Sequence, residues 1–197
     1  MKGAFITIYG INNIGKTTQA KILAKNLKRR GIKVKLVKFP RYDLKPTGPF
    51  INSVLRSPQG QKISEDELQM WFILNRYQAQ KELKDLLKQG YVIIAEDYTG
   101  TGIAWGMAKG CDEKWLTEAN KYLLKEDLAL FLQGKRHEFA KEKIHVHEQN
   151  DELIKKSDKS HLYLASKYGW RKINAAGSIF GTSKLILKEV DDFLKRR

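Results

Sequence analysis

Residues 4–18 read AFITIYGINNIGKTT, and this stretch decides the fold. A run of β-formers leads into a Gly-x-x-x-x-Gly-Lys-Thr pattern, and a segment with helical periodicity follows. Together they predict a P-loop, a turn whose backbone amides and following helix bind phosphate. Lys16 is expected to reach the β- and γ-phosphates of ATP, and the Thr17 hydroxyl to ligate Mg²⁺. The residues expected to bind ATP here are Gly10, Asn12, Asn13, Ile14, Gly15, Lys16, Thr17 and Thr18.

The length of 197 residues suits one α/β domain with a substantial core, and no linker divides the chain. A single domain over residues 1–197 is therefore expected. Cys111 is the only cysteine, so no disulfide can form within the chain, and a reducing, cytoplasmic location is expected. No apolar run approaches the roughly 20 residues of a membrane span, and no signal peptide is evident.

The chain is strongly basic, with 37 Lys and Arg against 22 Asp and Glu, a net charge of +15. Such a charge fits either a nucleic-acid surface or a surface that attracts nucleotide polyanions. The cations are spread through nearly every predicted helix, without a basic stripe interleaved with aromatic residues. Nucleic acid is therefore an unlikely partner, and small nucleotides are the expected ones.

Strand-like and helical segments alternate along the chain, which predicts a parallel sheet with helices on both faces. A capping box at Ser64 opens a long helix that ends at Gln89-Gly90. The segment with Pro46, Gly48 and Pro49 is predicted to be a loop at the end of the second strand. The predicted strands are 4–9, 34–39, 91–95, 128–133 and 170–174, and further helices start at Lys16, near Asp151 and after Ser178.

The third strand ends in two carboxylates, Glu96 and Asp97, which a doubly wound sheet would bring beside the P-loop. On the long helix, Phe72 and Arg76 are four residues apart and share one side. From periodicity alone, Phe72 is an ordinary core aromatic and Arg76 a solvated charge. Residues 134–149 lack clean periodicity and are expected to form a short, mobile, basic lid. Its histidines, His137, His145 and His147, match no common zinc spacing.

The order of these motifs resembles the thymidylate kinase family: a P-loop, Phe39-Pro40-Arg41-Tyr42, a long helix with Asn75-Arg76, then a carboxylate-x-Tyr98. The resemblance implies a three-layer α/β/α P-loop kinase with a five-stranded parallel sheet and a lid. It also implies transfer of the γ-phosphate of ATP to dTMP with Mg²⁺, in a homodimer.

Carried over by position, the resemblance places Phe39, Arg41 and Tyr42 near the monophosphate and the sugar. It makes Phe72 the aromatic that stacks on the base and Arg76 the residue that reads it. The loop 174–178, with Ala176, would contact adenine. The expected substrate-binding residues are Asn12, Phe39, Arg41, Tyr42, Phe72, Arg76, Tyr98, Gly102 and Trp105; Thr17 and Glu96 are the expected metal residues.

Three positions depart from the family pattern: Asn12 replaces an Asp, Asp97 replaces the catalytic Arg, and the aromatic near the sugar is Trp105. A carboxylate facing the transferred phosphoryl group would repel it, so Asp97 must pair with a cation or slow the enzyme. Arg136, with Lys135 second, is the expected substitute from the lid. The expected catalytic residues are Lys16, Glu96, Arg136 and Arg41.

The reaction expected from these observations is Mg·ATP-dependent phosphorylation of a nucleoside monophosphate, dTMP to dTDP. One alternative is a deoxynucleoside kinase, with Glu96 as the base for a sugar hydroxyl. Another is a P-loop nucleotide-binding protein or ATPase that acts with nucleic acid. The departures at Asn12, Asp97 and Trp105 bear on the identity of the acceptor.

Overall fold

The computed structural model describes residues 2–134 and 151–197. Five parallel strands form one sheet in the order β2-β3-β1-β4-β5. The predicted α/β fold with a five-stranded parallel sheet is confirmed. The strands are β1 (Ala4–Tyr9), β2 (Val34–Lys38), β3 (Val92–Glu96), β4 (Leu128–Gln133) and β5 (Arg171–Asn174).

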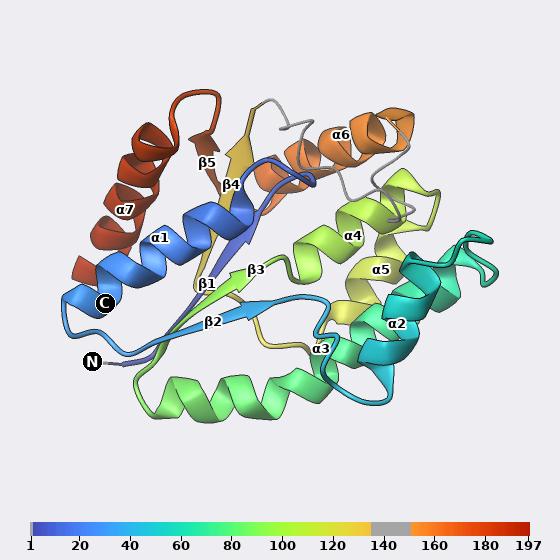
Figure 1. The fold of residues 1–197 in the computed structure, drawn as a ribbon, viewed down its shortest axis with the longest axis horizontal. Coiled ribbons are helices and arrows are strands. Elements are labelled where there is room, and N and C mark those ends of the chain that lie inside the picture. Colours follow the sequence, from blue (N-terminus) through green and yellow to red (C-terminus); the bar gives the residue numbers. More distant parts are fainter. Residues whose placement is uncertain (1, 135–150) are drawn as a thin grey trace.

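Helices cover both faces of the sheet (Figure 1). Alternate residues of β1 point to opposite faces, so Ile6 and Ile8 pack toward α1 and α7, whereas Phe5 and Tyr9 pack toward α3, α4 and α6. The helices are α1 (Lys16–Arg29), α2 (Thr47–Leu55), α3 (Glu65–Lys88), α4 (Thr99–Ala108), α5 (Glu113–Asn120), α6 (Asp151–Lys167) and α7 (Ile179–Lys195).

The register of the sheet brings three strand ends together. Within the sheet, Ile8 of β1 and Lys38 of β2 both lie opposite Glu96 of β3. Every residue of β1 and β3 is buried, as expected of central parallel strands covered on both faces. The P-loop after β1, the loop after β2 and the carboxylates at the end of β3 therefore meet at one edge.

The prediction of a loop around Pro46 is wrong, because helix α2 begins at Thr47. Proline is compatible with a helix start, since amides of the first turn have no partner within the helix. Pro46 precedes the helix and Pro49 lies in its first turn. Ile51 and Leu55 then become buried against the start of α3, which stabilises the helix despite its composition.

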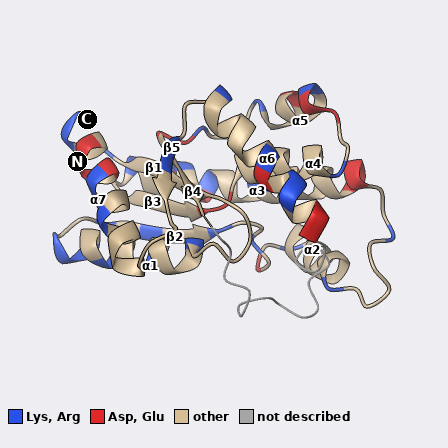
Figure 2. Cartoon of the chain, turned by 90° about the horizontal axis from the view of Figure 1, so that it is seen from above, with Lys and Arg blue, Asp and Glu red and all other residues tan. Residues whose placement is uncertain are grey.

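The positive charge is spread over the structure. Figure 2 shows Lys and Arg on helices of both layers, with acidic segments between them. In the two described ranges, no helix has the length and apolar character that a membrane crossing requires.

Candidate active site

The P-loop has the backbone conformation that its glycines predict. Gly10 has a φ of 144°, and a Cβ there would lie 2.9 Å from the Leu132 carbonyl oxygen. Lys16 is the first residue of α1, and only 5% of its side chain is exposed. Its ammonium donates to the carbonyls of Gly10 and Ile11, at 2.8 and 2.9 Å. The ammonium is thus held inside the loop that the sequence predicts to bind phosphate.

Thr17 and Glu96 face each other across the strand ends. The Thr17 hydroxyl lies 2.8 and 2.7 Å from the two Glu96 carboxylate oxygens. Oxygen ligands of this kind suit Mg²⁺, which proteins commonly hold with one or two side chains plus substrate phosphates. Within residues 2–134 and 151–197, no group of three or more His, Cys, Asp or Glu could hold a metal ion. The hydroxyl and the carboxylate are oxygen ligands that fit a magnesium ion shared with a nucleotide.

Lys38 joins this pair from β2. Its Nζ lies 2.9 Å from Oε1 of Glu96. Partial burial lowers the pKa of Lys38, but the charge of Glu96 and its hydrogen bond outweigh that effect, so the pKa is raised. Lys38 is a cation at neutral pH beside the predicted metal residues.

Asp97 lies behind the P-loop lysine. Its Oδ1 is 3.6 Å from Nζ of Lys16 and accepts a hydrogen bond of 2.7 Å from the Thr101 hydroxyl. Its φ is 62°, a left-handed conformation that Asp tolerates better than most residues. Burial raises the pKa of Asp97, the charge of Lys16 opposes that rise, and Glu96 adds to it. Asp97 thus pairs with a cation, one of the two outcomes expected from its position.

A cavity of about 500 Å³ connects the P-loop to the long helix α3. It brings together most of the predicted site: Asn12, Asn13, Gly15, Lys16, Thr17, Thr18, Phe39, Tyr42, Phe72, Arg76, Glu96, Tyr98, Gly102 and Trp105 line it. Phosphate-binding groups and aromatic residues therefore share one space. Its size is in the range of small-molecule sites.

The α3 end of the cavity holds a buried arginine. Burial lowers the pKa of Arg76 to about 10, so the guanidinium remains charged at neutral pH. One of its nitrogens donates to Asn120 at 3.1 Å, while its buried Nε has no hydrogen-bond partner among the described residues. A Cβ at Gly102 would lie 2.2 Å from a terminal nitrogen of Arg76, so glycine leaves room for the guanidinium in this position. Arg76 is therefore not the solvated charge that periodicity favours.

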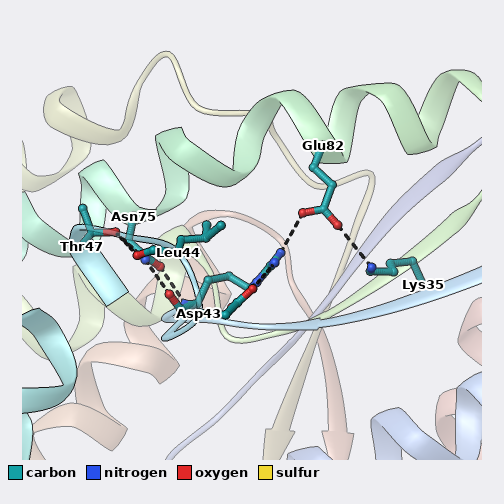
Figure 3. A network of polar contacts seen from close by, with 7 residues as sticks. Lys35, Asp43, Leu44, Thr47, Asn75 and Glu82 are labelled. Carbon is teal, nitrogen blue, oxygen red and sulfur yellow. Dashed lines mark hydrogen bonds and ion pairs between the residues drawn. The ribbon is translucent and has the colours of Figure 1, made fainter. Parts of the chain in front are cut away.

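Arg41, for which a catalytic and substrate-binding role is predicted, is placed away from the cavity. It does not belong to the described residues that line the cavity. Its guanidinium binds both oxygens of Asp43 at 2.8 and 2.7 Å and Glu82 at 3.0 Å. Figure 3 shows Glu82 bridging this network to Lys35. The partner on α3 could not be predicted from the sequence, because Glu82 is 41 residues away, whereas Asp43 is only two residues away.

Other predicted residues differ in their placement. Gly10, Ile14 and Ala176 do not line the cavity; Ile14 is buried in the core, and the Ala176 amide binds the Asn174 side chain at 2.9 Å. Tyr98 lines the cavity, but its ring packs against Phe5 and Phe39. Arg136, the other lid cations and the three lid histidines lie outside the described residues.

The lining residues that the sequence did not predict include Lys38, Arg56 and Gln69. Lys38 ends a strand at the edge where ligands bind in such sheets, and that position was a usable signal. Arg56 follows α2, with its guanidinium 5.0 Å from the ring centre of Tyr42. Because α2 was predicted as a loop, no pattern placed Arg56 near the cavity.

Comparison with known proteins agrees with this geometry. Residues 8–177 match the family model described as thymidylate kinase. Thymidylate kinase from Plasmodium falciparum is 27% identical over 193 residues, covering 96% of this chain and 90% of that protein. The one from Dictyostelium discoideum is 27% identical, covering 99% and 88%. The solved thymidylate kinase of Candida albicans superposes with a TM-score of 0.85 at 28% identity, covering 97% and 92%.

Proposed function

The chain belongs to the thymidylate kinase family, and from that premise we propose that it transfers the γ-phosphoryl group of ATP to dTMP, giving dTDP and ADP. The observation that carries the proposal is the shared cavity. Lys16 and Thr17 lie at one end of it, and Phe72 and Arg76 at the other. A phosphate-binding loop facing an aromatic ring and a guanidinium suits the juxtaposition of two nucleotides.

The donor end would bind ATP through the loop amides and Lys16. Thr17 and Glu96 would hold Mg²⁺, which neutralises charge on the donor phosphates when it is bound. Lys16 must exchange its contacts with Gly10, Ile11 and Asp97 for phosphate oxygens. Its buried stem limits where the ammonium can go, and this orients it toward the loop.

The acceptor end would bind the pyrimidine between the Phe72 ring and the Arg76 guanidinium. The unpartnered Nε of Arg76 supports this, since a buried donor without a partner is unfavourable until a ligand accepts from it. In the reaction, an oxygen of the acceptor phosphate forms a bond to the γ-phosphorus. The bond from that phosphorus to the bridging oxygen breaks, and the electron pair leaves with ADP.

The alternatives are less well supported. In a deoxynucleoside kinase Glu96 would accept a proton from a sugar hydroxyl, but both of its oxygens face Thr17 and one also faces Lys38. That placement favours a role beside the metal. The diffuse positive charge favours no nucleic-acid groove.

Assembly as a homodimer is also proposed, together with a single cytoplasmic domain whose lid spans about 134–149. Met70, Leu74 and Tyr77 are exposed on one side of α3, at a spacing of four and three residues. They help line an apolar hollow of about 330 Å³. An exposed apolar stripe of this kind supports an interface. Light scattering after size exclusion distinguishes a 22.7 kDa monomer from its dimer.

One experiment tests the catalytic proposal: ADP production with a panel of nucleoside monophosphates and nucleosides, with and without DNA. We expect the highest kcat/KM with dTMP and no stimulation by DNA. Turnover of thymidine but not dTMP would identify a nucleoside kinase instead. DNA-dependent hydrolysis without an acceptor would identify an ATPase.

A further inference from the structure

Among the described residues, few cations face the region in which the phosphoryl group would be transferred. Phosphoryl transfer brings together two highly charged nucleotides, and positive groups must offset the charge between them. Position 97 carries a carboxylate, and Arg41 is bound to Asp43 and Glu82 outside the cavity. Of the described residues that line the cavity, four are cations: Lys16, Lys38, Arg56 and Arg76.

Three of these four cations are held by partners other than the residues predicted to hold the metal. Lys16 is held within the P-loop, and Arg76 is buried against Asn120 at the opposite end. Arg56 lies over the Tyr42 ring and donates to Asn52 on α2. Lys38 remains as the cation beside the residues predicted to hold the metal.

The geometry of Lys38 suits a group that changes partners. Its backbone is fixed in β2, opposite Glu96 in the sheet. Its side chain is 59% exposed, whereas that of Glu96 is 8% exposed. The Lys38 side chain can therefore change its conformation while its backbone stays in the sheet. Its ammonium and the Thr17 hydroxyl both contact the Glu96 carboxylate.

Resting on the proposed kinase function, we propose that Lys38 is a further catalytic residue, whose ammonium leaves Glu96 when substrates bind and contacts the oxygens of the transferred phosphoryl group. It supplies there the positive charge that Asp97 does not. No proton moves to or from Lys38 in the step. The charge that develops on the phosphoryl oxygens is stabilised by the ammonium as a point charge.

Lys38→Met tests this inference, because it removes the charge and keeps an unbranched apolar stem. Lys38→Arg restores a cation, and Lys35→Met is the matched control. Lys35 lies on the same strand and pairs with Glu82 outside the cavity. We measure kcat and KM for both substrates, the Kd of Mg·ATP and the urea unfolding midpoint for each variant.

We expect Lys38→Met to lower kcat about a hundredfold, the loss typical of one transition-state donor. Its Mg·ATP Kd should stay within about threefold, because Lys16 and the loop amides provide ground-state binding. Lys38→Arg should keep kcat within about fivefold and Lys35→Met within about twofold, by the same reasoning. All unfolding midpoints should agree, since both lysines are more than two-fifths exposed.

Two results would overturn the inference: a kcat within threefold of wild type in Lys38→Met, or an equal loss in Lys35→Met. If the wild type prefers a monophosphate other than dTMP, the acceptor assignment fails alone. The same variants are then assayed with that acceptor, because Lys38 is proposed to contact phosphate and not the base. A loss of kcat in Lys38→Met with that acceptor supports the inference.

Discussion

Asn75 holds the loop after β2 against α3, and its removal should affect both stability and acceptor binding. The carboxamide is fully buried. It accepts from the Arg41 amide at 2.7 Å and donates to the Arg41 carbonyl at 2.9 Å and the Thr47 hydroxyl at 2.8 Å (Figure 3). Asn75→Leu keeps the branching at Cγ with a larger side chain and removes all three bonds.

The expected loss follows from counting these bonds. At about 1 kcal/mol for each net hydrogen bond, the three amount to about 3 kcal/mol of unfolding free energy. For a domain of this size that corresponds to a fall in Tm of about 6–12 °C. Asn75→Asp should be at least as harmful, because its carboxylate would face the Arg41 carbonyl without a proton to donate.

The functional consequence concerns the acceptor. The loop that Asn75 holds carries Phe39 and Tyr42, which line the cavity. We expect the KM for dTMP to rise about tenfold, equivalent to about 1.4 kcal/mol of binding. The KM for ATP should change by less than about threefold, since the lost hydrogen bonds hold the loop after β2 and not the P-loop.

Urea unfolding and steady-state kinetics, with each substrate varied separately, measure both effects. Asn26→Leu is the control, because the Asn26 side chain makes one hydrogen bond, to the Ile22 carbonyl within α1. The reasoning would be refuted if Asn75→Leu lost less than about 1 kcal/mol of unfolding free energy, the value of a single hydrogen bond, and kept the KM for dTMP unchanged.

Three further outcomes are expected. Lys16→Ala should lower kcat by about two to three orders of magnitude in the ADP assay, because it removes the point charge on the donor phosphates. Arg76→Ala should lower kcat/KM for dTMP by a factor equivalent to about 1–3 kcal/mol, the value of a charge-assisted hydrogen bond. The preference for dTMP over the other acceptors in the panel should also become weaker. Burial lowers the pKa of His161 to about 4, below the unfolded value of about 6.5, so the unfolded chain binds the extra proton between these values. Unfolding free energy should therefore fall as pH drops through this window, by about 3 kcal/mol more in the wild type than in His161→Gln.

The sequence predicted what depends on local pattern. The P-loop, all five strands and the start of α3 at its Ser64 cap lie within two residues of their predicted places. Each is fixed by neighbouring residues: a glycine spacing, a continuous apolar run or a capping side chain. Helix α2 was missed because Pro46 before it and Pro49 in its first turn favour a loop unless the burial of Ile51 and Leu55 is known.

The difference between local pattern and tertiary packing also explains where the charged residues of the site lie. Arg41 and Lys38 are both cations near the end of β2, and apart from Asp43, two residues from Arg41, nothing local separates them. Their partners do, since Glu82 on α3 binds Arg41 outside the cavity and Glu96 on β3 binds Lys38 inside it. The second pairing follows from the register of β2 against β3, which places position 38 directly opposite position 96. The partner of a charged residue at the end of a parallel strand thus depends on the register of the neighbouring strand, which the local sequence does not reveal.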